Sequence, residues 1–130
     1  MLIAEVSEKY EISADTLRYY ERVGLIPPVT RKSNGIRDYN EEDCGWVEFV
    51  KCMRHAGLQI ETLIEYVGLV QQGNTTVEAR KHILIEQREQ LIERIEHMQA
   101  TVKRLEMKIE NYDKTVGVAE KNLKKNENTQ

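Results

Sequence analysis

Apolar residues at helical spacing predict two short helices within residues 3–22, joined by a turn of two or three residues. Ser13 has the side chain of a good N-cap for the second helix, and Gly24, with Pro27 and Pro28 after it, ends that helix. Two helices connected in this way have the helix-turn-helix outline, although generic helix pairs have the same outline.

A hairpin and a second helix pair are predicted next. Asn34-Gly35 is the strongest two-residue signal for a type I′ turn, in which both central residues need positive φ, so residues 29–39 are expected to form a hairpin. Apolar residues at helical spacing then predict one helix over about residues 41–56 and another over about residues 60–72.

Beyond residue 73 the apolar positions repeat every seven residues, which is typical of a coiled coil. Thr75 and Glu78 have the spacing of a capping box at the start of this helix. The two sevenfold series are Leu84, Leu91, Met98, Leu105 and Tyr112, and Ile95, Val102, Ile109 and Val116. A helix of about 40 residues is roughly 60 Å long and cannot bury such a stripe against itself. A second copy of the chain is the simplest partner, and another protein is the alternative.

One face of the second short helix combines arginine with an exposed aromatic residue. At about 100° per residue, Asp15, Arg18, Tyr19 and Arg22 lie on one side of the helix, whereas Tyr20 lies on the other and is expected to pack inward. Arginine binds phosphate and guanine edges, and a tyrosine hydroxyl donates to phosphate. The spacing therefore fits a nucleic-acid surface, and it fits a solubilising face with an incidental tyrosine equally well.

Composition and short motifs argue against a membrane protein, a secreted disulfide-rich protein and an enzyme. The chain has 130 residues, of which 32% are charged, and a net charge of −3. It contains neither a signal peptide nor an apolar run of the roughly 18 to 20 residues that a membrane span needs, so we expect a cytoplasmic protein without membrane contact. Two cysteines do not suggest a secreted disulfide scaffold. No Gly-rich phosphate loop, metal-ligand cluster or nucleophile–base pair indicates an enzyme, a metal site or a cofactor.

The run ISADTLRYYERVGLIPPVTRKSNGIRDY resembles the N-terminal DNA-binding region of the MerR family of bacterial transcriptional regulators. The helix-turn-helix of that family typically ends in a T-L-R-Y-Y-E-x-x-G-L-[IL] string, and a wing ending in R-x-Y follows it. Residues 16–26 match the string throughout, and residues 37–39 match the end of the wing. The order of the predicted elements also fits over about residues 2–116.

The resemblance implies a mainly α fold, in which a winged helix-turn-helix DNA-binding domain precedes a long dimerisation helix that forms a coiled coil. The expected segments are a DNA-binding domain with its helix pair in residues 1–72, a hinge in 73–74, the coiled-coil helix in 75–117 and a polar, disordered tail in 118–130.

The implied partners are double-stranded promoter DNA, which family members bend and undertwist, a second copy of the chain, and RNA polymerase indirectly through that DNA. Carried over by position, the residues expected to reach bases are Asp15, Thr16 and Arg18. The residues expected to contact phosphates are Tyr19, Arg22, Arg37, Tyr39 and Arg54.

The chain also lacks the features of two known sensing classes. About a dozen polar residues follow the predicted coil, so no ligand domain of the multidrug-sensing type is expected. No cysteine follows Cys52, and the histidines form no spaced cluster, so thiolate metal sensing is not expected. A regulator with a noncovalent effector, or with none, remains an alternative, and so does a coiled-coil interaction protein.

The two cysteines are eight residues apart on one predicted helix. That spacing is about 12 Å along the axis, which exceeds the roughly 7 Å between Cα atoms that a disulfide allows. On a wheel whose core face holds Trp46 and Phe49, Cys44 is predicted on the outer side and Cys52 on the flank. Neighbouring Lys51 supplies positive charge that favours a thiolate.

The string EFVKCMRHAGLQIETLIEY resembles a short MerR-type subgroup that responds to aldehydes and other electrophiles through one cysteine in a K-C-M-R-x-A-G-L context. Residues 51–58 match that context, so the resemblance implies that Cys52 is a sensor thiol. The alternative is that Cys52 is a small packing residue with an inert thiol.

Overall fold

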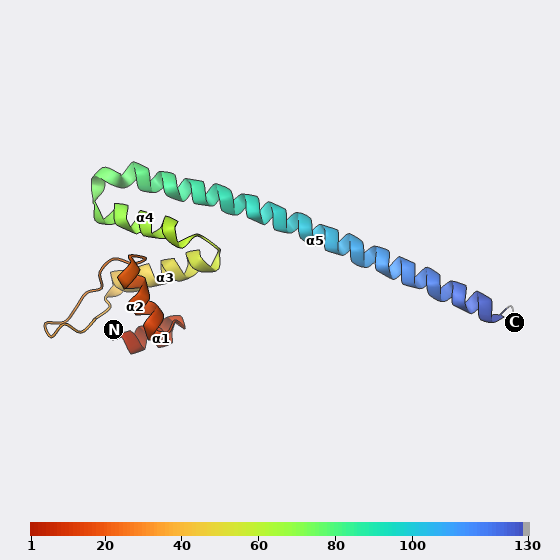
Figure 1. Cartoon of the computed structure of the whole chain (residues 1–130), viewed down its shortest axis with the longest axis horizontal. Coiled ribbons are helices and arrows are strands. Elements are labelled where there is room, and N and C mark those ends of the chain that lie inside the picture. The colour runs from red at the N-terminus through yellow and green to blue at the C-terminus, as the bar shows by residue number, and fades with distance from the viewer. Residues whose placement is uncertain (129–130) are drawn as a thin grey trace. The chain divides into compact units, whose positions relative to one another are not determined.

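The computed structural model describes the backbone of residues 1–128 and the side chains of residues 1–115. Its helices are α1 (Ile3–Tyr10), α2 (Ala14–Val23), α3 (Glu41–His55), α4 (Ile60–Gln71), the short 3₁₀ helix η1 (Asn74–Thr76) and α5 (Val77–Asn128) (Figure 1). Internal contacts divide the chain into a first unit, Met1–Arg88, and a second unit, Glu89–Gln130. None of the described helices combines the length and the apolarity that spanning a lipid bilayer requires.

Local signals placed the ends of helix α2 correctly. The Ser13 hydroxyl oxygen accepts a hydrogen bond from the Thr16 amide at 3.1 Å and so caps the N-terminus of the helix. At the other end Gly24 has a φ of 85°, a left-handed conformation in which glycine carries no Cβ penalty. The predictions of Ser13 as the cap and of Gly24 as the end are therefore confirmed.

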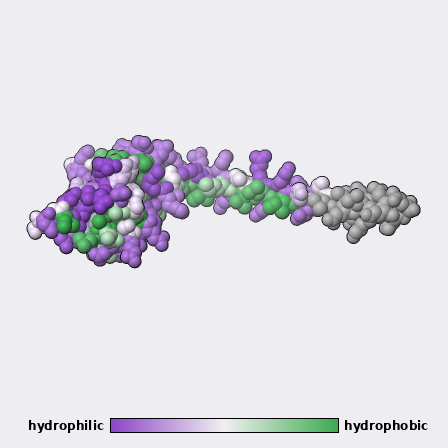
Figure 2. Space-filling view, turned by 60° about the horizontal axis from the view of Figure 1, so that its bottom comes forward, coloured by the Kyte–Doolittle hydropathy of each residue, from purple (hydrophilic) through white to green (hydrophobic). Residues whose placement is uncertain are grey.

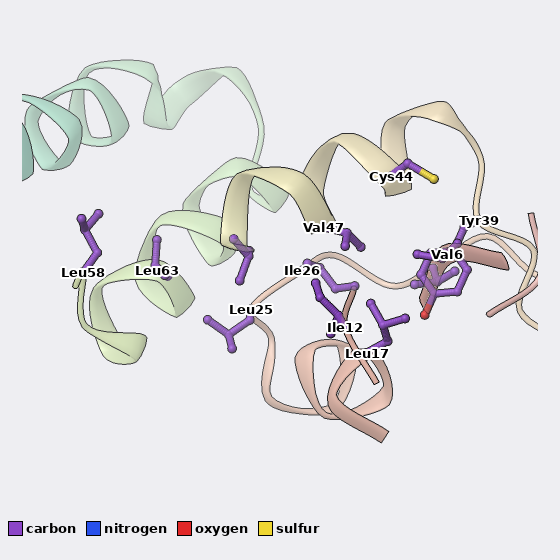
Figure 3. Packing of buried hydrophobic residues seen from close by; sticks show 12 residues of the cluster. Val6, Ile12, Leu17, Leu25, Ile26, Tyr39, Cys44, Val47, Leu58 and Leu63 are labelled. Atoms are coloured by element: carbon purple, nitrogen blue, oxygen red, sulfur yellow. The ribbon is translucent and has the colours of Figure 1, made fainter. Parts of the chain in front are cut away.

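The core of the first unit lies where α1, α2 and α3 meet (Figure 3). Val6 of α1, Leu17 of α2 and Val47 of α3 are completely buried there. Tyr20 packs against this cluster, whereas Tyr19 is 36% exposed, which confirms that the two adjacent tyrosines point to opposite sides of α2. Burial of the inner side holds the outer side of α2 toward solvent.

Helix α3 buries the predicted face and also a second face that was not predicted. Cys44 is only 8% exposed and shares the core with Val47, so its predicted place on the outer side is wrong. Trp46 and Phe49 are partly buried and contact Tyr66 of α4, with ring centroids 6.1 and 5.7 Å apart. The helix packs on two sides, and a wheel centred on its aromatic residues finds only the side toward α4.

The hairpin, which corresponds to the wing, is closed by a turn other than the predicted type I′ turn. The Gly35 amide donates to the Lys32 carbonyl at 2.9 Å, and the Lys32 amide donates to the Ile36 carbonyl at 2.8 Å, which makes a three-residue loop. Gly35 has a φ of 85°, but Asn34 does not have the positive φ that a type I′ turn needs. The Asn34 side-chain oxygen instead accepts a hydrogen bond from the Ile36 amide at 3.2 Å.

The start of α5 is organised by Thr76 and not by the predicted Thr75 cap. Thr75 lies inside η1, so it cannot be the N-cap residue of a helix that begins at Val77. Thr76 is buried. Its hydroxyl donates a hydrogen bond to the Leu69 carbonyl oxygen at 2.6 Å and lies 2.8 Å from the Gly73 carbonyl oxygen. Thr76 thereby links the end of α4 to the start of α5.

Helix α5 is longer than predicted. Its backbone is helical to Asn128, past residue 117, because the segment has no proline and is rich in residues of high helix propensity. Residues 129–130 of the predicted tail lie outside the described residues. In the second unit the apolar heptad side chains from Ile95 to Tyr112 are exposed, and Figure 2 shows green hydrophobic atoms along this helix. The side chain of Val116 is not among those described.

Candidate nucleic-acid interface

The outer face of α2 carries polar side chains that contact one another. Arg18 Nη1 lies 2.9 Å from Asp15 Oδ1, and the two side chains are 47% and 97% exposed. One turn further along, the Arg22 guanidinium lies 5.5 Å from the centre of the Tyr19 ring, within the range of a cation–π interaction. These contacts hold the two arginines on an exposed face of the helix, where their remaining N–H groups can reach an anion.

Thr16 has a role in the local structure as well as a place near this face. Its hydroxyl oxygen accepts a hydrogen bond from the Ser13 hydroxyl at 2.8 Å, and its amide donates to the same Ser13 oxygen at 3.1 Å. Thr16 is partly buried in the first turn of α2. The structure therefore brings Thr16 beside Asp15, but its side chain also takes part in capping the helix.

The wing is joined to α2 through Glu21. Glu21 Oε1 accepts hydrogen bonds from Arg37 Nε at 2.7 Å and from Arg31 Nη2 at 3.3 Å. Glu21 Oε2 accepts a hydrogen bond from the Val29 amide at 2.5 Å. Arg31 also donates to the Gly35 carbonyl at 3.0 Å, inside the loop of the wing. One carboxylate thus contacts the first residue of the hairpin and both of its arms.

Three arginines come together at a hollow of about 380 Å³ in the first unit. Arg18 approaches it from α2, and Arg31 and Arg37 approach it from the wing. The remaining lining residues are Leu2, Ile3, Ala4, Gly35 and Ile36. Arginines bind anions such as phosphate groups, and three of them line this one concave surface.

Sequence reasoning missed two members of this arrangement, Arg31 and Glu21. The position of Arg31 in the wing has no motif of its own. Glu21 belongs to the T-L-R-Y-Y-E string, which was a signal that could have identified it. Its contacts with Val29, Arg31 and Arg37 depend on tertiary folding, however, and no short-range pattern predicts them.

The structure places two predicted phosphate contacts outside this surface. Tyr39 is 1% exposed, and its hydroxyl has no hydrogen-bond partner among the described residues, so the side chain is part of the core and not of the surface. Burial raises the pKa of the Tyr39 hydroxyl, and this effect is larger than the opposing effect of the positive charge of Arg37, which lowers the pKa. Arg54 donates to the Leu58 carbonyl at 2.7 Å and thereby holds the turn after α3. Arg54 does not line the hollow.

The two cysteines of α3 have opposite environments. Cys52 is exposed and Cys44 is buried, and neither forms a disulfide. Next to Cys52, Lys51 Nζ donates to the Tyr10 carbonyl at the end of α1, at 2.5 Å. No group of three or more His, Cys, Asp or Glu side chains within the described residues could hold a metal ion.

Comparison with known families shows the family of the chain. Residues 1–68 match the family described as "MerR HTH family regulatory protein", and residues 45–107 match "MerR, DNA binding". The chain belongs to the MerR family. This MerR-family chain therefore carries the DNA-binding region of a family of transcriptional regulators. The resemblance inferred from residues 12–39 is confirmed, and so is the mainly helical helix-turn-helix fold with a long C-terminal helix.

Named relatives support this assignment. The HTH-type transcriptional regulator AdhR of Bacillus subtilis (strain 168) is 63% identical over 93 residues, which are 72% of this chain and 66%, just under two thirds, of AdhR. A MerR family protein from Listeria monocytogenes, known from a crystal structure, is 48% identical with a TM-score of 0.88, covering 95% of this chain and 94% of that chain. HiNmlR, a MerR family regulator lacking the sensor domain and crystallised with promoter DNA, is 28% identical with a TM-score of 0.79, covering 87% of this chain and 90% of its own.

Proposed function

We propose that the protein binds promoter DNA as a homodimer through α2 and the wing, distorts that DNA, and is switched by modification of Cys52. The observation that carries the DNA-binding surface is the hollow where Arg18 of α2 meets Arg31 and Arg37 of the wing. HiNmlR, the relative crystallised with promoter DNA, supports the choice of ligand.

We propose that some of these residues contact base edges and that others contact phosphates. An α-helix fits the major groove, so the exposed Asp15 and Arg18 on α2 are placed to read base edges. Tyr19, Arg22 and the wing arginine Arg37 contact phosphates on either side. Arg31 joins this set because it lines the same hollow as Arg18 and Arg37.

Specific binding is tested with DNA that the wild-type protein selects from a library of random duplexes. If Arg18 makes a bidentate contact with a base, Arg18→Ala should weaken binding by about 1–3 kcal/mol, and specificity should relax at one position. Arg104→Ala, an arginine truncation on the second unit, is the matched control. Wild-type affinity and sequence preference in Arg18→Ala would contradict the proposed surface.

Dimerisation is supported by the exposed apolar heptad positions of α5. A helix with a continuous apolar stripe buries it against a partner helix, and two identical chains do so with two-fold symmetry. RNA polymerase then responds to the shape of the promoter and makes no required contact with this chain. Bending measured by energy transfer between the two ends of a labelled duplex tests the distortion, and an unchanged end-to-end distance would exclude it.

Sensing through Cys52 is supported by three features of its surroundings. The thiol is exposed and free, so an electrophile can reach it. The residue lies on α3, and Cys44 and Val47 of that helix pack into the core shared with α1 and α2. Lys51, its neighbour, donates to the Tyr10 carbonyl at the end of α1. A group added to Cys52 therefore stands beside a direct link between the sensor helix and the helix-turn-helix.

The proposed chemistry is an addition. With a small α,β-unsaturated aldehyde, the Cys52 thiolate sulfur forms a bond to the β carbon, the double-bond electron pair shifts toward the carbonyl, and the α carbon then takes a proton. The product is a thioether whose mass exceeds that of the protein by the mass of one aldehyde.

Mass spectrometry of the treated protein and in vitro transcription together test this step. The wild type should acquire one adduct at Cys52, and the amount of transcript should change with the extent of modification. Cys52→Ser should retain DNA binding and lose the response, and Cys44→Ser is the control that should behave as the wild type does. A response retained in Cys52→Ser would instead favour a noncovalent effector.

A further inference from the structure

We infer that Glu21 is the positioning residue that holds the wing at a set place against α2, and that it thereby determines the specificity of DNA binding more than its strength. The inference rests on the proposed function, in which α2 and the wing contact the same DNA. Glu21 itself is only 11% exposed at its side chain and contacts other residues, so it acts through them.

Both carboxylate oxygens of Glu21 are used, and they reach three separate points of the wing. Oε2 accepts the Val29 amide at the start of the hairpin. Oε1 accepts Arg31 from the first arm and Arg37 from the second, at 3.3 and 2.7 Å. Arg31 and Arg37 are also the residues that pair across the hairpin as an antiparallel bridge. A single side chain of α2 therefore fixes the start and both arms of the wing.

Glu21 makes the polar contacts between α2 and the wing. Among the described residues, every hydrogen bond or ion pair between α2 and residues 29–39 ends on Glu21. The base of the wing is held separately by α3, because the Thr30 amide donates to Asp43 at 3.2 Å and the Asn40 side chain donates to the Thr30 hydroxyl at 3.0 Å. Without Glu21 the wing keeps its base and the core packing of Val29 and Tyr39, but it loses its hydrogen bonds and ion pairs with α2.

The chemistry of the site explains why a carboxylate of this length is needed. The three groups that face Glu21 are all N–H donors, and an ionised carboxylate offers acceptors only. Glutamine would turn an NH₂ group toward one of these donors. Aspartate would keep the charge but is shorter by one methylene group, so it cannot hold the Val29 amide and the Arg37 guanidinium at the present distances.

A second role for Glu21 would act through charge alone, because a buried negative charge near a phosphate-binding surface repels DNA of any sequence. The two roles make different predictions for Glu21→Asp. Charge alone predicts wild-type behaviour, since the charge is unchanged. Positioning predicts a loss of specificity, since the geometry is changed.

The experiment compares the full-length wild type with Glu21→Asp, Glu21→Gln and the control Glu48→Gln, which removes one exposed carboxylate from α3. Fluorescence anisotropy measures affinity for the duplex that the wild type selects and for a shuffled duplex, at several salt concentrations. We expect the ratio of the two affinities to fall by about tenfold or more in both Glu21 variants. Affinity for the shuffled duplex should stay unchanged in Glu21→Asp and rise in Glu21→Gln, which has one fewer negative charge.

Hydrogen exchange of the free protein supplies a readout that needs no DNA. The Val29 amide should exchange faster in Glu21→Asp than in the wild type or in Glu48→Gln, while the amides of α1 and α2 should be unaffected. Val29 protection and an affinity ratio that both match the wild type would overturn the inference. So would a Glu21→Asp variant that fails to fold, because Glu21 would then serve folding and not the placement of the wing.

The outcomes also separate this inference from the proposed function. A wild type that selects no duplex contradicts the proposed function, and the exchange of Val29 still decides whether Glu21 holds the wing. A wild type that selects a duplex, together with a Glu21→Asp variant of equal specificity, contradicts only the role of Glu21.

Discussion

Leu105 offers a quantitative test of the proposed dimer, because a matched position lies two residues away. Leu105 is 58% exposed and Met107 is 57% exposed, so the two side chains leave similar fractions of their surfaces uncovered. Leu105 belongs to the heptad series, whereas Met107, at about 100° per residue, lies on the other side of α5. Only Leu105 should therefore become buried when a second chain packs against the stripe.

The expected effect follows from these fractions. Full burial of a leucine side chain contributes about 2 kcal/mol, so covering the 58% that is exposed contributes about 1.2 kcal/mol per chain. Leu105→Ala removes this contribution twice in a symmetric dimer, or about 2.4 kcal/mol, which corresponds to a dissociation constant weakened about 50-fold. Both alanine substitutions raise helix propensity slightly and to a similar extent, so that effect cancels in the comparison.

Sedimentation velocity over a range of protein concentrations measures the dissociation constant of the dimer. Circular dichroism of the same samples verifies that both variants remain helical. We expect Leu105→Ala to dissociate at concentrations where the wild type and Met107→Ala remain dimers. Equal dissociation constants for Leu105→Ala and Met107→Ala would refute the assignment of the heptad stripe as the dimer interface, and so would a wild type that is monomeric at all working concentrations.

Three further predictions concern the first unit. Iodoacetamide should alkylate Cys52 in the native protein and Cys44 only after unfolding, because Cys44 is 8% exposed; equal labelling rates by mass spectrometry would contradict this. Tyr39→Phe should leave the free energy of unfolding unchanged or raise it by up to about 1 kcal/mol, because the buried hydroxyl has no partner among the described residues. Burial raises the pKa of Tyr39 above its usual 10.0, so the unfolded chain loses the hydroxyl proton at a lower pH than the folded chain does. The free energy of unfolding should therefore fall as the pH rises above 10.0. In urea unfolding this fall should be smaller for Tyr39→Phe than for the wild type. Thr76→Val should lower the free energy of unfolding by about 1–3 kcal/mol, because the hydroxyl contacts two carbonyl groups, and an unchanged urea midpoint would exclude this role.

Much of the candidate site could be predicted from the sequence because it depends on the geometry of one helix. The cap at Ser13, the end at Gly24 and the outward direction of Tyr19 all involve residues within one or two turns of each other. A helical wheel for α2 is reliable because that helix packs on one side only. The same reasoning was wrong for Cys44, because α3 packs on two sides and its aromatic residues mark just one of them.

Local patterns predict the five α-helices among the described residues, the exposed face of α2 and the sevenfold stripe of α5, since each arises from neighbours three, four or seven residues apart. The contacts of Glu21 with Val29, Arg31 and Arg37 depend on tertiary folding, since these partners are 8, 10 and 16 residues further along the chain. The burial of Tyr39 depends on it as well. The physical reason is that a local pattern specifies which direction a side chain takes from its own helix. Only the packed chain specifies what that side chain meets there.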